Sequence, residues 1–351
     1  MTPKRRIIPI FIPNAGCMHE CVFCDQRRIS GFDTSVNAAA VHRVIENGKL
    51  KIENGENPQI LEIAFYGGSF TALTSACQDE LLMAAQPFIQ QNAKNSIRIS
   101  TRPDCIDKHT VERLKILGVK TIELGAQSMC NEVLEASQRG HKSSDVERAA
   151  EIIKASGLSL VLQMMTGLPG DSREKSLSTA EQFVRLKPDG VRIYPTVVVY
   201  GTRLHAMWLS GEYKEQTLQD AVELCAELCA IFEEADVPVI RIGLNPTESL
   251  SAADAVAGAY HPALGELVYS KIYYNKAAAL LGGVAPGSDV TISVAKGRVS
   301  IMTGQRRKNL EGLKTTFSLR SIKVMESESL AGKQGEAAAL SITAEKRIEK
   351  P

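Results

Sequence analysis

Apolar runs rich in valine and isoleucine alternate with longer amphipathic segments along the first two thirds of the chain. The runs are continuous rather than alternating, which is typical of strands in a parallel sheet that helices cover. We predict strands at residues 7–13, 62–68, 96–103, 121–128, 158–167 and 190–199. The amphipathic segments predict helices at residues 38–47, 75–91, 107–117, 144–156, 172–186 and 216–235.

Capping residues support these boundaries. Ser75, Asp107 and Ser172 stand where three predicted helices begin, and their side chains suit the first helical turn. Gly118 and Gly157 stand just past two helix ends, where glycine tolerates a left-handed backbone. Six strand–helix units in a row predict an α/β fold, which is either a parallel barrel or a doubly wound sheet.

The pattern changes after a seventh apolar run at residues 239–244. Residues 290–294 and 298–302 flank Lys296-Gly297, which predicts a β-hairpin. The last residues are rich in Ala, Glu, Ser and Lys, which predicts a loosely held helix or a disordered segment. We therefore expect three parts, namely a core at 1–244, a small α+β extension at 245–325 and a flexible tail at 326–351.

Composition limits the class of protein. The 351 residues are 44% hydrophobic, which is enough for a core without disulfide support. A net charge of +1 neither favours nor excludes nucleic acid, because a local basic patch can lie within a neutral total. No stretch is long enough for a membrane span or a signal peptide, so we expect a cytoplasmic protein with no membrane partner.

Eight cysteines are too few for a disulfide scaffold, and three of them stand close together after the first predicted strand. Cys17, Cys21 and Cys24 have the spacing C-x3-C-x2-C. Three thiolates on a short loop hold three irons of a 4Fe–4S cluster and leave the fourth iron open to another molecule. A zinc site, which usually needs a second ligand pair, and chance clustering of buried cysteines are the less favoured alternatives.

Small and polar residues stand at the ends of the next two predicted strands. Gly67 and Gly68, followed by Ser69, either let exposed backbone approach a ligand or form an ordinary turn. Arg102 and Asp104 either bind a carboxylate or a ribose, or form a surface ion pair.

Polar residues also interrupt the fourth and fifth predicted strands. Alternation places Glu123, Gly125 and Gln127 on one face of the fourth strand, and Gln163 is the odd polar residue of the fifth. Glu and Gln side chains inside a barrel are costly unless they bind something. His141 fits a catalytic role and a core histidine equally well.

The cysteine triplet, with Phe23 before its last cysteine, resembles that of the radical S-adenosylmethionine (SAM) superfamily. The resemblance implies a partial (β/α)6 TIM-type barrel and a 4Fe–4S cluster on which Cys17, Cys21 and Cys24 are catalytic metal ligands. It also implies that SAM binds the open iron and is cleaved to a 5′-deoxyadenosyl radical. A donor of the flavodoxin or ferredoxin type would supply the electron.

Residues 7–244 resemble the Elongator complex protein 3 family, and more distantly the oxygen-independent coproporphyrinogen oxidases. The likeness is strongest at residues 123–128, 139–141, 165–170 and 194–204. It implies that SAM is bound by Phe23, Gly67, Gly68, Ser69, Glu123, Gln127, Arg139 and Gln163. The Elongator family has a longer gap between its first two cysteines and a C-terminal acetyltransferase domain, of which this chain has no signature. Its carboxymethylation chemistry is therefore not carried over.

The C-terminal extension has a basic segment. Between residues 296 and 323, eight basic residues stand against one acidic residue, Glu311. This bias predicts contact with an RNA phosphate backbone, with Arg306, Arg307 and Lys308 at its centre, or else a solvated face.

The other five cysteines carry weaker predictions. Cys225 and Cys229 share one face of a predicted helix and fit the core. Cys77, Cys105 and Cys130 follow strand-end motifs, where one of them can quench a radical or bind an auxiliary cluster.

Three functions fit these patterns. The favoured one is a radical SAM enzyme that modifies tRNA or another RNA. The others are a radical SAM enzyme for a small molecule, such as a tetrapyrrole or a carboxylic acid, and a haem carrier without enzyme activity.

Overall fold

The computed structural model describes residues 5–12, 17, 20–25, 36–53, 60–244, 254–330 and 340–345. The chain forms two compact units. One comprises residues 1–216 and 244–260, and the other comprises residues 217–243 and 261–351. Residue 244, the predicted end of the core, is where the chain returns from the second unit to the first.

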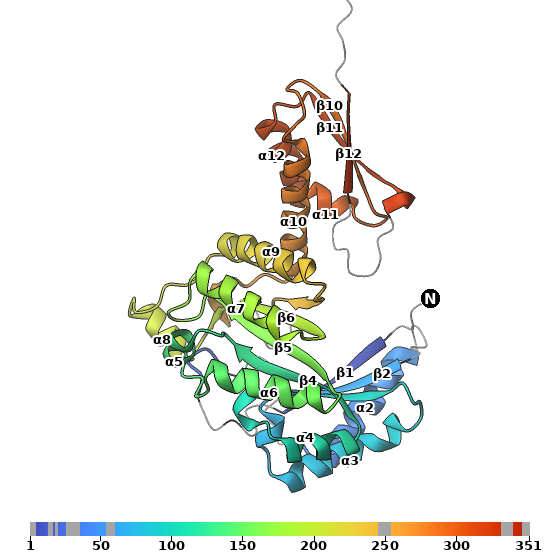
Figure 1. Cartoon of the computed structure of the whole chain (residues 1–351), viewed down its shortest axis with the longest axis vertical. Coiled ribbons are helices and arrows are strands. Elements are labelled where there is room, and N and C mark those ends of the chain that lie inside the picture. The colour runs from blue at the N-terminus through green and yellow to red at the C-terminus, as the bar shows by residue number, and fades with distance from the viewer. Residues whose placement is uncertain are drawn as a thin grey trace, which may run out of the picture. The chain divides into compact units, whose positions relative to one another are not determined.

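The first unit contains six parallel strands in sequence order, each hydrogen-bonded to the next. They are β1 (Arg5–Ile12), β2 (Ile60–Gly67), β3 (Ser96–Thr101), β4 (Val119–Gln127), β5 (Ser159–Thr166) and β6 (Gly190–Pro195). The connecting helices are α2 (Ala38–Glu53), α3 (Ser75–Ile89), α4 (Lys108–Ile116), α6 (Ser143–Ala155) and α7 (Arg173–Leu186). The predicted strand–helix alternation is confirmed (Figure 1).

Local capping explains several of these boundaries. Asp107 accepts a hydrogen bond from the Thr110 amide at 2.9 Å, and Ser172 caps α7 in the same way. Helix α3 is capped by Thr74, the residue before the predicted Ser75. Gly118 and Gly157 adopt φ angles of 89° and 78°, as the left-handed helix ends require.

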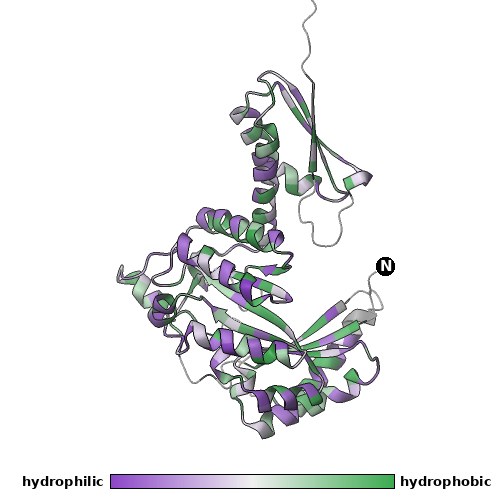
Figure 2. Cartoon of the chain, in the orientation of Figure 1, coloured by the Kyte–Doolittle hydropathy of each residue, from purple (hydrophilic) through white to green (hydrophobic). Residues whose placement is uncertain are grey.

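The outer face of the sheet is apolar and covered by helices. Its buried side chains include Ile63, Phe65, Ile97, Ile99, Ile122 and Leu124. Figure 2 shows mostly hydrophobic strands and helices that carry both colours, as expected where only one helix face packs on the sheet. Burial of these apolar side chains stabilises the unit.

The inner face of the sheet is charged. Arg98 on β3 pairs with Glu62 on β2 at 3.0 Å and with Glu123 on β4 at 3.5 Å. Arg192 on β6 reaches the same Glu123 carboxylate at 3.1 Å. Both carboxylates are almost completely buried, with exposed fractions of 0% for Glu62 and 2% for Glu123. These four residues are called the lumen network below.

The lumen network also shows that the sheet is curled. Arg192 donates a hydrogen bond to the hydroxyl of Tyr66 on β2 at 2.9 Å. Strands β2 and β6 are four strand spacings apart, so a flat sheet would separate them by about 19 Å. The two strands therefore face each other across a lumen, and the predicted partial barrel is confirmed. Strand β1 lies at the sheet's edge and, among the described residues, pairs only with β2.

The first unit also contains two short strands and two short helices. Strand β7 (Val197–Val199) pairs antiparallel with β9 (Ala255–Gly258). The predicted strand 190–199 is thus two strands, because the chain leaves β5 after Pro195 and pairs with β9 instead. The helices are α5 (Asn131–Ala136) and α8 (Arg203–Leu209).

The second unit is an α+β fold. Its helices are α9 (Leu218–Glu234), α10 (Leu264–Leu281), α11 (Val299–Thr303) and α12 (Lys308–Thr316). Its strands are β8 (Val239–Ile242), β10 (Asp289–Val294), β11 (Ser321–Glu326) and β12 (Leu340–Glu345). Strand β10 lies between β11, which is parallel to it, and β12, which is antiparallel. No helix in the described ranges is long and apolar enough to cross a bilayer.

Two predictions for this unit are corrected. Residues 298–302 are not the second strand of a hairpin, because residues 299–303 form α11 and both edges of β10 are taken by β11 and β12. Within the predicted tail, residues 340–345 form strand β12, since their hydrogen bonds complete the antiparallel edge of β10. Residues 331–339 and 346–351 lie outside the described residues.

The lumen network yields a stability prediction. Arg98→Leu removes the guanidinium that pairs with Glu62 and one of the two that pair with Glu123. We expect the free energy of unfolding, measured with urea, to fall by about 3–5 kcal/mol, because buried carboxylates lose their counter-charge. The double variant Arg98→Leu/Glu62→Leu is expected to lose less free energy of unfolding than Arg98→Leu alone.

The matched control is Arg148→Leu, which removes the exposed ion pair with Asp145 on α6. We expect that change to cost under about 1 kcal/mol. Equal losses in the Arg98 and Arg148 variants would contradict a stabilising role for the lumen network.

Candidate active site

The segment that carries Cys21 and Cys24 is docked on the barrel by backbone hydrogen bonds. The Cys24 amide closes a turn onto the Cys21 carbonyl at 3.1 Å. Between them, the Val22 amide donates to the Ser137 carbonyl at 3.2 Å, and the Val22 carbonyl accepts from the Leu204 amide at 2.7 Å. The two cysteines are therefore held at the ends of the strands, where active sites of parallel barrels lie.

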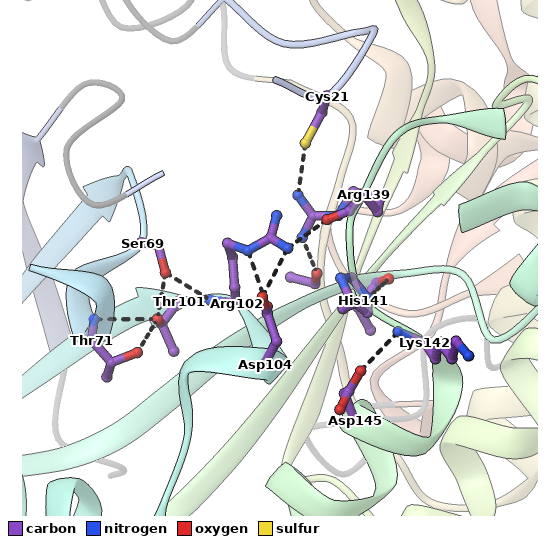
Figure 3. A network of polar contacts seen from close by, with 12 residues as sticks. Cys21, Ser69, Thr71, Thr101, Arg102, Asp104, Arg139, His141, Lys142 and Asp145 are labelled. Carbon is purple, nitrogen blue, oxygen red and sulfur yellow. Dashed lines mark hydrogen bonds and ion pairs between the residues drawn. The ribbon is translucent and has the colours of Figure 1, made fainter. Parts of the chain in front are cut away.

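Arg139 connects this loop to β4. Its Nη1 donates to the Cys21 sulfur at 3.2 Å, and its Nη2 donates to the Gly125 carbonyl at 2.6 Å (Figure 3). Its exposed fraction is 7%, and its Nε has no hydrogen-bond partner among the described residues. A buried donor without a partner is costly, so this position suits an anionic ligand.

Arg102 fixes the backbone of Arg139. Its Nη2 donates to the Arg139 carbonyl, and its guanidinium holds the Asp104 carboxylate by two bonds of 3.0 and 3.1 Å. The residue is 4% exposed. The sequence left open whether Arg102 and Asp104 bind a ligand or form a surface ion pair. The structure shows an ion pair in which Arg102 is buried, and Arg102 also holds the backbone of Arg139.

A group of hydroxyls joins the ends of β2 and β3. The Ser69 Oγ lies 3.0 Å from Thr101 Oγ1 and accepts a hydrogen bond from the Arg102 amide at 3.3 Å. Gly67, two residues before Ser69, has φ +106°. A Cβ at residue 67 would lie 3.4 Å from the Ile12 backbone at the end of β1. Glycine thus lets this turn lie against the strand from which the cysteine segment departs.

Cys17 lies in the same electrostatic environment. Desolvation of its thiol and the nearby Cys21 raise the pKa of Cys17, while Arg102, Arg139 and a hydrogen bond from the Ser69 backbone lower it. Burial is the larger influence, so the pKa of Cys17 is raised overall, and Arg139 also contacts the second predicted ligand, Cys21.

The donor set fits a cluster better than a single ion. In the described part of the chain, no three His, Cys, Asp or Glu side chains converge as the ligands of one metal ion do. Each thiolate of a 4Fe–4S cube binds a different iron, so the sulfurs need not converge. Three cysteines of one segment, of which Cys21 contacts an arginine whose Nε has no partner among the described residues, suit a cube with one open iron and an anionic molecule bound to it.

Gln127 and Gln163 lie together beside Gly125. Gln163 Nε2 donates to Gln127 Oε1 at 3.2 Å, and a Cβ at residue 125 would lie only 2.9 Å from Gln127 Nε2. The pairing of β4 with β5 shifts register between Gly125 and Gln127, and Gln127 has φ +65°. This bulge interrupts the predicted alternation and places the Gln127 amide beside that of Gln163.

Three other predicted residues have contacts of their own. Glu123 belongs to the lumen network and is held by two arginines. Phe23 packs against the buried cluster of Val22, Val198, Leu204 and Tyr213. His141 is buried with Nε2 at 3.2 Å from the Ala126 carbonyl, and burial, with help from Arg139, lowers its pKa to about 4. His141 is therefore neutral at pH 7.

Sequence reasoning missed several polar residues. Glu62, Arg98 and Arg192 each interrupt an apolar strand, which is the signal that identified Gln163. The hydroxyls of Thr71 and Thr101 meet next to Ser69. Their partnership was not visible in the sequence because it joins residues 30 positions apart.

Two family models match the chain. The model of the radical SAM superfamily matches residues 11–183. The model of the radical SAM C-terminal domain matches residues 188–274. The first match includes all three cysteines and every residue of the Arg139 contacts described above.

Relatives with curated names are similar over part of their length. The tRNA uridine(34) acetyltransferase of Methanocaldococcus infernus is 28% identical over 303 residues, which are 75% of this chain and 55% of that protein. The same enzyme of Methanocaldococcus jannaschii is 35% identical over 49% of this chain and 31% of its own length. Human Elongator complex protein 3 is 30% identical over 54% of this chain and 38% of its own. The chain thus spans between a third and about half of these relatives.

A solved structure has the same fold. The archaeal Elp3 of Methanocaldococcus infernus, with an N-terminal deletion, matches 79% of this chain and 64% of its own with a TM-score of 0.62 and 25% identity.

His141 yields a pH prediction. Its folded pKa of about 4 is below the ordinary value of 6.5, so the unfolded chain takes up a proton first as the pH falls. Stability is then lost progressively from about pH 6.5 to pH 4, by at most about 3 kcal/mol. We expect urea unfolding of the metal-free His141→Gln variant to show a shallower loss than the wild type over this range.

The control is His109→Gln, a change at an exposed residue of α4, which is expected to follow the wild type. The prediction fails if His141→Gln loses stability with pH as steeply as the wild type does.

Proposed function

The chain belongs to the radical SAM superfamily and is a radical SAM enzyme, and from that premise we propose that it modifies RNA, with tRNA as the favoured substrate. The observation that carries this proposal is the likeness over the barrel to a tRNA uridine(34) acetyltransferase and to Elongator complex protein 3. The chain spans only part of those proteins, so neither an acetyl transfer nor a particular modified base is proposed.

Members of the superfamily use a 4Fe–4S cluster and SAM, and Cys17, Cys21 and Cys24 are the residues that we propose as cluster ligands. When bound, the cluster supplies the electron that breaks a carbon–sulfur bond of SAM and releases methionine and a 5′-deoxyadenosyl radical. Radical SAM enzymes need a reductant, and we propose a protein donor of the flavodoxin or ferredoxin type.

Side chains around the cysteines are proposed to hold SAM. The partnerless Nε of Arg139 supports contact with the methionine carboxylate, because a guanidinium matches carboxylate oxygens. The amides of Gln127 and Gln163 are suited to the ribose hydroxyls, since an amide both donates and accepts. The backbone at Gly67, Gly68 and Ser69 is suited to the methionine amino group, with Phe23 and Glu123 as less direct contributors.

The lumen network determines where a substrate enters. Paired charges from four strands lie inside the barrel, and rearranging them would leave buried carboxylates without a counter-charge. A substrate therefore approaches from the strand ends, past the cysteine segment. This direction suits a large molecule that presents one residue to the site.

The second unit offers a basic surface for RNA. Arg306, Arg307 and Lys308 are consecutive and exposed at the beginning of α12. Arg306 and Arg307 adopt φ angles of 52° and 62°, a left-handed conformation that is uncommon for long side chains. The two guanidiniums and the ammonium suit phosphate oxygens, which repeat along any RNA.

Anaerobic reconstitution followed by SAM cleavage tests the proposed function. We expect about four irons per chain, and more 5′-deoxyadenosine with bulk tRNA present than absent. If an RNA-free metabolite fraction stimulates cleavage and tRNA does not, the substrate is a small molecule. Tight haem binding without SAM cleavage would indicate a carrier and overturn the assignment of the site.

Charge reversal at Arg306 and Arg307 tests the basic surface. We expect tRNA binding to weaken as salt is raised. In the double change to Glu, the slope of the logarithm of the binding constant against the logarithm of the salt concentration is expected to become shallower, as the loss of about one or two phosphate contacts implies. Filter binding at several salt concentrations measures both effects. The control is Arg148→Glu, an exposed arginine of α6, which is expected to bind like the wild type. Identical salt dependence in all three proteins would contradict the proposed contact of RNA with Arg306 and Arg307.

Gly125→Ala tests the proposed SAM contacts. The new Cβ would meet Gln127 Nε2 at 2.9 Å and Arg139 Nη2 at 3.4 Å, and both are ends of flexible side chains. The protein is expected to fold, but SAM affinity measured by calorimetry is expected to fall at least about tenfold as these contacts shift. The control is Gly283→Ala, where nothing lies within 4 Å. Unchanged SAM affinity in Gly125→Ala would contradict the proposed contacts of SAM with Gln127 and Arg139.

A further inference from the structure

The inner face of the sheet is more exposed at the strand ends than deeper in the barrel. Glu62, Arg98 and Glu123 are only 0%, 6% and 2% exposed. Nearer the strand ends, inward-facing side chains of four strands (Figure 1) are half-buried, namely Phe11 on β1, Tyr66 on β2, Gln163 and Met165 on β5, and Arg192 and Tyr194 on β6. Solvent therefore reaches the inner face at this level, so a ligand can contact these side chains.

Tyr66 is held in place at this level. Its hydroxyl accepts a hydrogen bond from Arg192 Nη2 at 2.9 Å, and the Arg192 guanidinium carbon lies 5.2 Å from the centre of the Tyr66 ring. On β1, the centre of the Phe11 ring lies 6.2 Å from that of Tyr66. A ligand that contacts Tyr66 therefore meets a side chain that is already ordered.

The guanidinium of Arg192 is occupied by neighbouring side chains. Its Nε lies 3.1 Å from the Glu123 carboxylate, and its Nη1 donates to the Tyr194 hydroxyl at 3.2 Å. With Nη2 on Tyr66, each of its three nitrogens lies next to a polar group. Arg192 thus orients the phenol of Tyr66, while Glu123 balances its charge.

The hydroxyl of Tyr66 has a hydrogen left to donate. A phenol oxygen that accepts one hydrogen bond still carries its own hydrogen. Among the described residues, the hydroxyl has no hydrogen-bond partner besides Arg192. Burial, Glu123 and Glu62 raise the pKa of Tyr66 to about 12, although Arg192 and Arg98 lower it. The phenol therefore keeps its hydrogen at neutral pH.

The surroundings of Tyr66 indicate what accepts this hydrogen. The amino group of SAM only donates, and its carboxylate and ribose have their proposed contacts at Arg139 and the two glutamine amides. Phe11 and Met165 make this part of the inner face apolar, so a charged acceptor such as a phosphate would be costly to bury there. A neutral carbonyl oxygen of the substrate fits better.

We propose that the hydroxyl of Tyr66 donates a hydrogen bond to a carbonyl oxygen of the substrate and so orients the substrate's reacting carbon. Tyr66 keeps its hydrogen throughout, so its role is to bind and to select substrates that carry an acceptor at this position. The proposal rests on the proposed cluster and SAM site, and it holds for an RNA and for a small molecule alike.

Tyr66→Phe removes the hydroxyl and keeps the ring beside Phe11 and Arg192. With bulk tRNA as substrate, we expect kcat/KM for 5′-deoxyadenosine formation to fall at least about tenfold, because a buried hydrogen bond to the substrate is lost. Iron content and the SAM affinity measured by calorimetry are expected to match the wild type. An unchanged kcat/KM, or a loss that is accompanied by loss of iron or of SAM binding, would overturn the contact.

The matched control is Tyr269→Phe. Tyr269 is a half-buried tyrosine of α10, in the other unit, and its hydroxyl makes no hydrogen bond with the described residues. We expect this variant to keep the kcat/KM of the wild type. An equal loss in both variants would show that the effect of Tyr66→Phe is not specific to the site, and the contact would be wrong.

A fluorinated tyrosine at residue 66 separates donation to the substrate from support of Arg192. Its more acidic phenol loses the hydrogen at a pH at which the wild-type phenol, with a pKa of about 12, keeps it. The phenolate still accepts from Arg192, so a purely structural role survives, whereas donation to the substrate is lost. We expect kcat/KM, relative to the wild type at the same pH, to fall as the pH rises through the pKa of the fluorinated phenol. A constant ratio would assign Tyr66 a structural role only.

Failure of this contact is distinguishable from failure of the RNA function. If tRNA stimulates SAM cleavage equally in the wild type and in Tyr66→Phe, the contact is wrong and the RNA function stands. If only an RNA-free metabolite fraction stimulates the wild type, the RNA function is wrong, and a weaker response of Tyr66→Phe to that fraction supports the contact. If neither preparation stimulates the wild type, both proposals fall.

Discussion

Pairing of buried charges within the barrel is the constraint on which the arrangement of this site depends. Arg98 and Arg192 approach the single carboxylate of Glu123, and Arg98 also holds Glu62. A buried charge without a partner costs several kcal/mol, so β2, β3, β4 and β6 are restricted to the registers that keep these contacts. Those registers determine where each strand ends. The residues after the strands meet in an arrangement that is consistent with the charge pairs inside the lumen.

The site is a set of separate segments brought together by main-chain and side-chain hydrogen bonds. Arg139 illustrates this, since it lies between α5 and α6, is held by Arg102 from the segment after β3, and contacts Cys21 from the segment after β1. No segment is adequate alone. Precise placement therefore comes from buried polar contacts around the site rather than from the apolar layer outside the sheet.

Local pattern predicted the sheet's strands and its helices, because apolar runs and capping residues act over a few positions. It also identified the cysteine triplet, whose spacing carries the chemistry. Contacts between distant strands were not accessible, so Arg98 and Arg192 went unnoticed although each interrupts an apolar run. Helix α10 was missed because its apolar residues are not gathered in one stripe. The hairpin at residues 298–302 was wrong because a five-residue stretch is too short to separate strand from helical periodicity.

A barrel that is not closed keeps a strand edge. Strand β1 pairs with β2 along one side, and its outer side belongs to an edge strand, the kind of surface to which another chain can add. Pro9, in the middle of β1, has no amide hydrogen, and the strand begins with Arg5 and Arg6. A proline in an edge strand removes one amide donor from the backbone ladder, which is one way in which edge strands avoid pairing with another copy. The open edge of the sheet thus carries, in the sequence of its first strand, a residue type that disfavours aggregation.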